Sequence, residues 1–365
     1  MWLCCWAATG TEKPKGGASH RCAAFAKIER KAAKHMKIIK KILKITLCTV
    51  LVLAMLGGYL FWEVTRRTGV APVETDGADN GLITPLGTTM LSGHRSGGGI
   101  APENTMMALR NCVESDEYRL DIFEFDIHLT ADGIPVLIHD GTLDRTSDAA
   151  AVFGAEGVRV GDKTLAELKE LNMGARFRAD DGTTPFAGLT GDDVPEELRI
   201  LTLDEALGYL EESGPYHYII EIKNSGETGY RAADILYDTL VQYGALERTV
   251  VGTFHNEITA YIDATYPDML RSAGFNEVIE FYVYSLLKLP KKDGWDFVAL
   301  QIPTTDYTVN LGTSRLVNYA HKHDIAVQYW TINDPEEMAY LQSIGADAVM
   351  TDVPDKGAEV LTQPN

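Results

Sequence analysis

The residues best suited to chemistry lie between His94 and Asp140, within fewer than fifty positions. The segments HR, PENT, EFDIHLTADG and IHD place histidine, arginine, asparagine and carboxylate side chains along runs that otherwise have the composition of buried strands. An unpaired buried charge costs roughly several kcal/mol, so apolar strands rarely carry this many ionisable groups unless the groups meet at a site. The stretch therefore predicts an active site.

Three carboxylates have a spacing that suits a metal ion. Glu124 lies two residues before Asp126, and Glu221 lies two residues before Lys223. Residues two apart on a strand face the same side, so each pair points in one direction. The alternative is a set of surface charges, but the first pair sits within the apolar run IFEFDI. Carboxylate oxygens are hard ligands, which favours Ca²⁺ or Mg²⁺ over zinc.

Two histidines and an arginine complete a set that suits phosphodiester cleavage. His94 and Arg95 end one strand-like run, and His139 ends another. A cation and an arginine can neutralise a phosphoryl group while one histidine removes a proton from the attacking hydroxyl and the other protonates the leaving alkoxide. Both tasks suit a side chain that titrates near neutrality. Each histidine could instead be a structural strand-end residue, the role that we expect for His128.

Eight short β-rich runs must position these side chains, with helical patterns between many of them. The runs cover residues 90–94, 122–129, 218–223, 249–254, 270–275, 297–302, 325–332 and 347–352. The helical patterns cover Asn104–Ser115, Leu203–Glu212, Tyr230–Tyr243 and Thr313–His323. Eight strands with helical crossovers predict an α/β fold, a (β/α)8 TIM barrel, in preference to an open doubly wound sheet. The segment SGGGIAPEN lacks the spacing of a dinucleotide-binding fingerprint.

One further strand-like segment, PVLIHD at residues 135–140, follows the second run after only TADGI. A parallel return needs about a dozen residues or more, so this connection predicts an antiparallel hairpin. A short hairpin at the rim would hold His139 over the carboxyl-terminal mouth of the barrel, where barrel enzymes place their chemistry.

The N-terminal part differs in charge from the rest of the chain. Residues 1–67 hold thirteen Lys or Arg and three Glu, whereas the whole chain has 33 basic and 52 acidic residues. Residues 45–62, ITLCTVLVLAMLGGYLFW, form an uncharged run of about the length that crosses a bilayer. Lysines precede this run closely, which predicts a cytoplasmic N-terminus and an extracytoplasmic acidic part. A buried core helix and a cleaved signal peptide are the alternatives. No A-x-A cleavage site follows the run, and bulky Tyr59, Phe61 and Trp62 at its end stand where small residues would be wanted, which favours a retained anchor.

These features predict four segments. They are a basic cytoplasmic tail at 1–44, whose true start could be Met36, a transmembrane signal anchor at 45–62, a linker at 63–87 and a barrel domain at 88–358. Of five cysteines only Cys112 lies beyond the anchor, which excludes a disulfide or a cysteine-based zinc site within the barrel. The acidity of the barrel part argues against nucleic acid as a partner.

The sequence also resembles a known family, the glycerophosphodiester phosphodiesterases, which belong to a superfamily of PI-PLC-like phosphodiesterases. The resemblance runs from about Leu91 to Pro354 and rests on the segments HR, APENT, EFD, LTADGIPVLIHD, DRTSD, TLAEL, TLDEAL, IIEIK, YWTIN and MTDVPD. It implies an acid and base pair, His94 and His139. It implies a divalent cation, Ca²⁺ or Mg²⁺, on Glu124, Asp126 and Glu221. It further implies phosphate contacts from Arg95 and Lys223, a pocket-lining Trp330, and a site shaped by Glu103 and Asn104. Ser96 departs from the glycine usual after HR.

The resemblance implies hydrolysis of a glycerophosphodiester to sn-glycerol 3-phosphate and an alcohol. The attack could come from a neighbouring glycerol hydroxyl, through a cyclic phosphate, or directly from water. Expected substrates are deacylated phospholipid headgroups, lysophospholipids or glycerol-phosphate polymers of an envelope, near a membrane that the N-terminal helix would enter. Two alternatives remain: a related phospholipase C- or D-like lipid phosphodiesterase, and an inactive membrane-anchored binding protein. The presence of both histidines and all three carboxylates argues against the second.

Overall fold

The structure is a computed structural model that describes residues 17–66, 71–74, 79–306 and 309–364. It divides into two units, Met1–Thr65 and Arg66–Asn365, of which the second holds the predicted barrel. Helix α1 (Gly17–Thr65) forms the first unit.

Seven parallel strands form the wall of the barrel. They are β1 (Met90–Gly93), β2 (Ile122–Leu129), β4 (His217–Ile222), β5 (Thr249–Gly252), β6 (Ala299–Ile302), β9 (Ala326–Tyr329) and β10 (Ala348–Thr351). Their order in the sheet is β5-β4-β2-β1-β10-β9-β6. Parallel bridges join Val251 to Arg271 and Ser272 to Ala299, so residues 271–272 connect the two outer strands. The predicted TIM barrel is confirmed, although the predicted strand at 270–275 is reduced to these bridges.

The alternation of side chains along each strand explains this wall. All eight residues of β2 are buried, and its outward residues Phe123 and Phe125 join the main apolar core between strands and helices. Ile122 belongs to a second core cluster, with Met90 and Ile219 of the neighbouring strands. Glu124 and Asp126 share the face of Ile122 because residues two apart point the same way. The strand period therefore turns both carboxylates away from the outer core.

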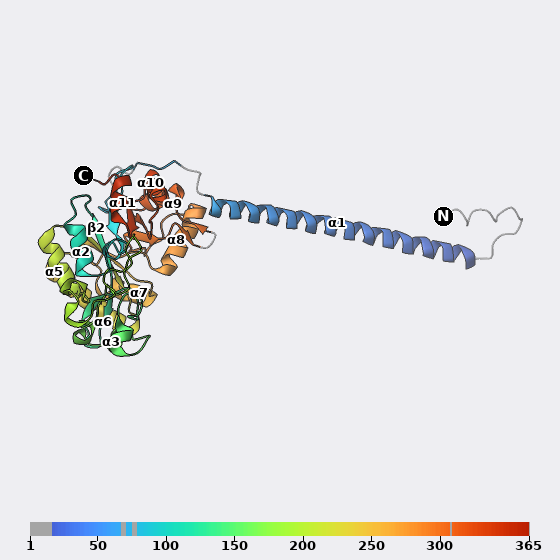
Figure 1. The fold of residues 1–365 in the computed structure, drawn as a ribbon. Coiled ribbons are helices and arrows are strands. Elements are labelled where there is room, and N and C mark those ends of the chain that lie inside the picture. Colours follow the sequence, from blue (N-terminus) through green and yellow to red (C-terminus); the bar gives the residue numbers. More distant parts are fainter. Residues whose placement is uncertain (1–16, 67–70, 75–78, 307–308, 365) are drawn as a thin grey trace, which may run out of the picture. The chain divides into compact units, whose positions relative to one another are not determined.

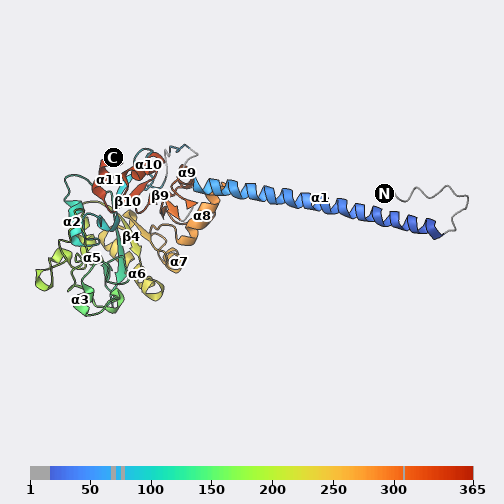
Figure 2. The same cartoon turned by 45° about the vertical axis from the view of Figure 1, so that its right-hand side comes forward.

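Helices follow most strands and surround the barrel (Figures 1 and 2). They include α2 (Met106–Val113), α5 (Leu203–Ser213), α6 (Gly226–Tyr243), α7 (Asn256–Thr265), α8 (Phe275–Leu287), α9 (Ser314–His321), α10 (Pro335–Ser343) and α11 (Pro354–Val360). Side-chain caps define several helix starts; for example, Thr202 and Glu205 form a capping box on α5. The four predicted helices are present with ends shifted by a few residues. Helix α8 was not predicted.

The predicted hairpin is present at the end of β2. Strand β3 (Pro135–Leu137) pairs antiparallel with β2, with Ile127 opposite Leu137. His139 follows two residues after β3. Val136 of the hairpin packs in a separate apolar cluster, which includes Leu168 and Ile200. This cluster includes residues of the short helices α3 (Ala149–Phe153) and α4 (Leu165–Leu168).

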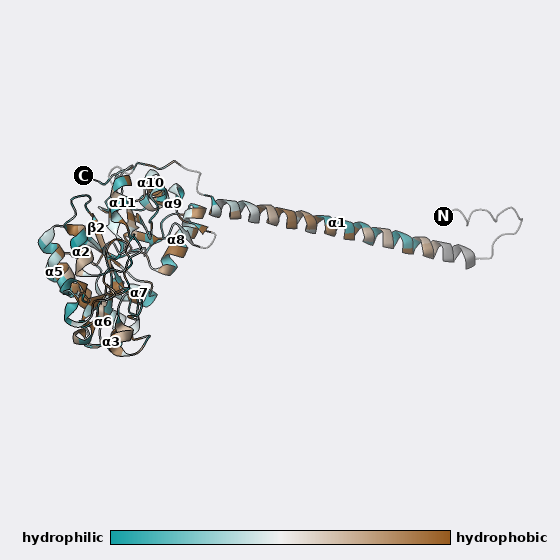
Figure 3. Ribbon diagram, in the orientation of Figure 1, coloured by the Kyte–Doolittle hydropathy of each residue, from teal (hydrophilic) through white to brown (hydrophobic). Residues whose placement is uncertain are grey.

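The described residues contain one helical stretch long and apolar enough to cross a membrane, Ala23–Tyr59 in α1, with a mean hydropathy of 2.0 in its most apolar window. Figure 3 shows this hydrophobic part of α1 beside a hydrophilic part. Length and composition alone also suit a signal sequence. In the segment predicted as a linker, the Asn80 side chain donates hydrogen bonds to the carbonyl oxygens of Val298 and Asp324. Residues near Asn80 are thus bound to the barrel.

The buried Asp347 connects three segments of the chain through hydrogen bonds. Asp347, with no exposed surface, accepts hydrogen bonds from Thr84 N at 2.9 Å, Val327 N at 2.6 Å and His321 Nε2 at 2.8 Å. The substitution Asp347→Ala leaves these buried donors unpaired, so we expect the free energy of unfolding to fall by about 3–5 kcal/mol. Urea unfolding followed by circular dichroism measures this loss. The exposed Asp238→Ala serves as control; equal stability of the two variants would contradict the prediction.

Candidate active site

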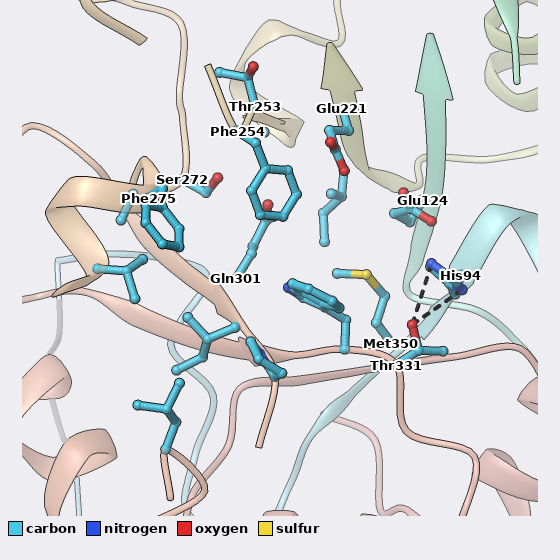
Figure 4. A pocket seen from close by; sticks show the side chains of 18 of the residues that line it. His94, Glu124, Glu221, Thr253, Phe254, Ser272, Phe275, Gln301, Thr331 and Met350 are labelled. Carbon is cyan, nitrogen blue, oxygen red and sulfur yellow. Dashed lines mark hydrogen bonds between the residues drawn. The ribbon is translucent and has the colours of Figure 1, made fainter. Parts of the chain in front are cut away.

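The carboxyl ends of the parallel strands bring the predicted residues to one mouth of the barrel. His94 and Arg95 follow β1, Lys223 follows β4, and Trp330 follows β9, while Glu124 and Asp126 lie in β2. A cavity of about 590 Å³ opens at this mouth. Eight predicted residues line it: His94, Arg95, Glu124, Asp126, His139, Glu221, Lys223 and Trp330. Figure 4 shows His94, Glu124 and Glu221 around this cavity.

His94 is paired with an aspartate that follows the last strand of the barrel, β10. Its Nδ1 lies 2.6 Å from Asp352 Oδ1, and Asn333 Nδ2 donates to Asp352 Oδ2 at 2.7 Å. Burial lowers the pKa of His94, but the hydrogen bond to Asp352 and the charge of Glu124 outweigh burial, so the pKa lies above the ordinary value of 6.5. Thr331 Oγ1 lies 3.5 Å from both ring nitrogens. His94 is thus oriented by residues that sequence reasoning did not select.

His139 has an aspartate partner of its own. Its Nδ1 lies 2.7 Å from Asp140 Oδ1, and Arg145 Nε donates to Asp140 Oδ2 at 2.6 Å. Although burial raises the pKa of Asp140, the bond from Arg145 prevails and the pKa is about 2. Arg145 also makes two hydrogen bonds of 2.7 Å to the Glu103 carboxylate. Arg145, absent from the sequence prediction, therefore links Asp140 to Glu103.

Of the three carboxylates, Glu124 and Asp126 are buried and Glu221 is partly buried, and their pKa values are shifted differently. Burial and the neighbouring Asp126 raise the pKa of Glu124 to about 8, and its Oε2 accepts a hydrogen bond of 2.6 Å from the Arg95 backbone N–H. Burial raises the pKa of Asp126, but Lys223 outweighs burial and the pKa is lowered. Lys223 Nζ lies 3.0 Å from Asp126 Oδ1 and 2.8 Å from Glu221 Oε1. Burial raises the pKa of Glu221 despite this ammonium group. The single ammonium group of Lys223 cannot neutralise three carboxylates, Glu124, Asp126 and Glu221.

These residues fit a hard divalent cation by donor type and charge. In the described part of the chain, no three His, Cys, Asp or Glu side chains are grouped closely enough to form a ready metal cluster. Yet burial and the charge of Asp126 outweigh the nearby His94 and raise the pKa of Glu124, an effect that a cation beside its carboxylate would oppose. Asn104 Oδ1 is a buried oxygen without a hydrogen-bond partner, while its Nδ2 donates to Asp126 Oδ2 at 3.2 Å. Unpaired buried oxygens suit Ca²⁺ or Mg²⁺.

The loop after β1 is held in an unusual backbone conformation. Arg95 has φ 50°, Ser96 has φ 62° and Asn104 has φ 57°, a region that non-glycine residues adopt rarely and mainly where the surroundings enforce it. The Asn104 N–H donates to the Arg95 carbonyl at 3.1 Å, and Arg95 Nη1 donates to Glu103 at 3.2 Å. Glu103 and Asn104 do not line the cavity. Instead, Glu103 accepts a hydrogen bond from Arg95, and Asn104 donates one to Asp126.

His128 lies outside the cavity lining. Its Nε2 is 3.3 Å from the His139 carbonyl oxygen and its Nδ1 is 3.4 Å from Asn224 Nδ2. Burial lowers the pKa of His128 to about 4, so the ring stays neutral near pH 7. This geometry places His128 as a support of the hairpin that carries His139.

A TIM barrel whose mouth combines paired histidines, buried carboxylates, a lysine and an arginine has the means to neutralise and cleave a phosphodiester. Comparison with known proteins defines the class further. The sequence profile of the Glycerophosphoryl diester phosphodiesterase family matches residues 94–356. The chain belongs to this family and is a glycerophosphodiester phosphodiesterase, a phosphoric diester hydrolase.

Curated relatives agree with this assignment, and solved structures share the fold. The chain is 24% identical to "Glycerophosphodiester phosphodiesterase" from Bacillus altitudinis over 74% of this chain and 98% of the relative. It is 27% identical to "Glycerophosphodiester phosphodiesterase 1" from Bos taurus over 74% and 80%. The fold is similar to that of a glycerophosphoryl diester phosphodiesterase from Silicibacter pomeroyi, with a TM-score of 0.60, 21% identity, and coverage of 78% of this chain and 98% of that one. It is also similar to an Oleispira antarctica phosphodiesterase in complex with sn-glycerol-3-phosphate, with a TM-score of 0.55, 23% identity, and coverage of 75% and 96%.

Proposed function

We propose that this enzyme hydrolyses a glycerophosphodiester to sn-glycerol 3-phosphate and an alcohol with His94 and His139 as its acid and base pair. One observation carries the proposal: each histidine contacts an aspartate through Nδ1, at 2.6 Å for His94 and 2.7 Å for His139. A hydrogen bond at Nδ1 fixes the ring and leaves Nε2 to exchange a proton with a substrate. Both rings line the cavity that contains the carboxylates.

The two histidines differ in a way that supports separate tasks. The raised pKa of His94 favours its protonated form, which suits a general acid that protonates the leaving alkoxide. His139, more exposed than His94, would remove the proton from the attacking hydroxyl. This division makes activity depend on a protonated His94 and a neutral His139.

Charged side chains of the mouth would bind the phosphodiester. Arg95 and Lys223 line the cavity, and we assign them to the phosphate oxygens, where fixed positive charge stabilises the developing negative charge. Glu124, Asp126 and Glu221 would hold Ca²⁺ or Mg²⁺. When bound, the cation would neutralise charge on a phosphoryl oxygen. Trp330 would border the substrate from the opposite strand.

Product analysis tests the proposed reaction. The full-length protein should convert glycerophosphocholine to glycerol 3-phosphate and choline in equal amounts, as measured by enzymatic assays of both products. A transient cyclic glycerophosphate would indicate attack by the neighbouring hydroxyl, whereas its absence under rapid quench would favour direct attack by water. Release of phosphocholine and glycerol would contradict the proposed bond cleavage.

The pH dependence should respond to the aspartate partner of His94. Asp352 raises the pKa of His94, so Asp352→Asn should lower that pKa. The protonated acid would then be lost at lower pH, and the alkaline limb of the kcat/KM profile should shift to lower pH by about one unit. The exposed Asp296→Asn is the matched control. An unshifted alkaline limb in Asp352→Asn would remove His94 from the role of acid.

We further propose that α1 anchors the protein in a membrane as a single span with a cytoplasmic N-terminus. Support comes from the apolar stretch within Ala23–Tyr59 and from the lysines at positions 37, 40, 41 and 44 just before its uncharged part. Protease added to intact cells should then digest the barrel. Complete protection, with digestion only after the cells are opened, would contradict this orientation.

A further inference from the structure

A chain of alternating charges joins two of the residues that line the cavity. Arg145 Nη1 and Nη2 each donate a hydrogen bond of 2.7 Å to the Glu103 carboxylate, and Arg145 Nε donates one of 2.6 Å to Asp140. Asp140 lies 2.7 Å from the ring of His139. Glu103 accepts hydrogen bonds of 3.2 Å and 3.3 Å from Arg95. One guanidinium group thus connects the histidine that we assign as the base to the arginine that we assign to the phosphate.

The two ends of this chain of charges belong to different segments of the barrel. Arg95 lies in the loop after β1, and His139 follows the hairpin of β2 and β3. Both side chains line the cavity, whereas Arg145 does not. A contact that fixes their spacing is valuable, because groups misplaced by about 1 Å can lose about a hundredfold in rate. Arg145 reaches both segments at once and can supply this contact.

The turn that carries Arg145 is itself anchored. Leu143 is fully buried in the apolar cluster that includes part of β3. The hydroxyl group of Ser147 donates a hydrogen bond of 2.6 Å to the Leu143 carbonyl oxygen. Asp144 accepts hydrogen bonds of 2.9 Å and 3.1 Å from the Gly157 N–H. Arg145 therefore extends from a fixed backbone, and its planar guanidinium group presents its donors in a rigid fork.

Stability alone does not account for this arrangement. The Arg145 side chain is 44% exposed, and ion pairs at exposed positions stabilise a fold little. Glu103 and Arg95 are 15% and 17% exposed, and a carboxylate in this position would compete with a phosphate for the arginine. Glu103 makes shorter hydrogen bonds to Arg145 than to Arg95. Arg145 therefore balances the charge of Glu103 and leaves the charge of Arg95 available to a phosphate.

We propose that Arg145 is a positioning residue with two separate effects, an inference that rests on the proposed function. Through Asp140, Arg145 fixes the ring of His139, which supports the catalytic rate. Through Glu103, it keeps a carboxylate from competing with the phosphate for Arg95, which supports the binding of substrate. Arg145 acts only through these neighbours, from outside the cavity lining.

The kinetics of Arg145→Gln should show both effects. With the full-length protein and glycerophosphocholine, we expect kcat to fall about thirtyfold, because the ring of His139 is no longer fixed. We expect KM to rise about tenfold, because Glu103 then binds Arg95 more closely. The thermal unfolding temperature should fall by no more than about 3 °C. The exposed Arg159→Gln is the matched control, with unchanged kcat and KM.

Two double variants distinguish these effects from a general disturbance of the fold. Asp140→Asn should lower kcat, and the addition of Arg145→Gln should lower kcat no further, because both substitutions act on His139. The addition of Glu103→Gln to Arg145→Gln should return KM close to that of the unmodified protein, because the competing charge is gone, while kcat stays low. A disturbed fold would instead make the losses accumulate in both double variants.

A milder substitution, Arg145→Lys, gives an independent test and also serves if the glutamine variant does not fold. Lysine keeps the positive charge but lacks the planar fork, so one ammonium group cannot hold Glu103 and Asp140 in the same geometry. Its kcat should fall about tenfold.

The opposite results overturn the inference in distinguishable ways. Unchanged kcat and KM in both Arg145 variants would reject it and leave the proposed function intact. A loss of kcat that adds to that of Asp140→Asn would reject the positioning of His139. A raised KM that Glu103→Gln does not relieve would reject the effect on Arg95. An unmodified protein that releases no choline would reject the proposed function and the inference with it.

Discussion

Substitution of His139 by glutamine should lower kcat by about a thousandfold. Glutamine can keep a hydrogen bond to Asp140 but cannot accept and return a proton near neutral pH, and general acid–base catalysis contributes about 10²–10⁴ in rate. The affinity for the cation and the KM should change little, because the His139 imidazole is hydrogen-bonded to Asp140, which is not one of the proposed cation ligands. Steady-state kinetics with glycerophosphocholine measures the loss.

The control for this substitution is His128→Gln. His128 lies outside the cavity lining and has a lowered pKa, so its glutamine variant should retain activity within about tenfold. The comparison keeps the chemical change the same and alters only its place in the barrel. If His139→Gln retained activity within tenfold as well, His139 would not be part of the acid and base pair.

Substitution of Glu124 by alanine should lower kcat/KM by about three orders of magnitude. The three carboxylates Glu124, Asp126 and Glu221 form the proposed cation site, and a bound cation stabilises phosphoryl charge in the transition state by several kcal/mol, equivalent to roughly a thousandfold or more in rate. Titration calorimetry should show weaker binding of Ca²⁺ and Mg²⁺. Glu221→Ala should behave in the same way.

The fold of these variants should remain intact. Burial raises the pKa of Glu124 to about 8, so folding near pH 7 must either protonate this carboxyl group or bury its charge; its removal relieves that cost, and thermal unfolding should occur at an equal or higher temperature. The exposed Glu212→Ala provides a control for kinetics and stability. Undiminished activity and cation affinity in Glu124→Ala would discard the proposed ligand set.

Most of the barrel could be predicted because its strands are short apolar runs that end in charged residues. The run at 122–129 became β2 with the same limits, and the short TADGI connection correctly implied the antiparallel β3. Helix α8 was missed because FNEVIEFYVYSLL is apolar on two faces and shows no helical alternation. Its Phe281 face packs in the core, while its Ile279 face lines the cavity. With apolar side chains on two faces, the few polar residues of α8, such as Glu277 and Glu280, do not give a clear amphipathic period.

Site residues could be predicted from the sequence where the two-residue period of a strand places them on one face. Glu124 and Asp126 share a face of one strand, and both line the cavity as expected. Asp352 was missed because it meets His94 across 258 positions of sequence, although its place after the last strand could have suggested it. Arg145 had no signal apart from the family segment DRTSD, since only the fold brings it to Asp140 and Glu103.

Lys223 shows a different limit of sequence reasoning. The family resemblance implies that Lys223 contacts the phosphate, whereas in the structure its ammonium group forms ion pairs with Asp126 and Glu221. Strand alternation predicts which face a side chain takes but not which of several opposite charges it contacts. A cation on Asp126 and Glu221 would therefore compete with the ammonium group of Lys223 for these two carboxylates.

The most direct test of cation-assisted cleavage follows choline and glycerol 3-phosphate release from glycerophosphocholine by the full-length protein before and after treatment with EDTA. We expect release to stop with the chelator and to return when Ca²⁺ or Mg²⁺ is restored, with no return in Glu124→Ala. Release at the full rate in excess EDTA, from protein shown by elemental analysis to be free of metal, would contradict a cation-assisted phosphodiesterase built on these carboxylates.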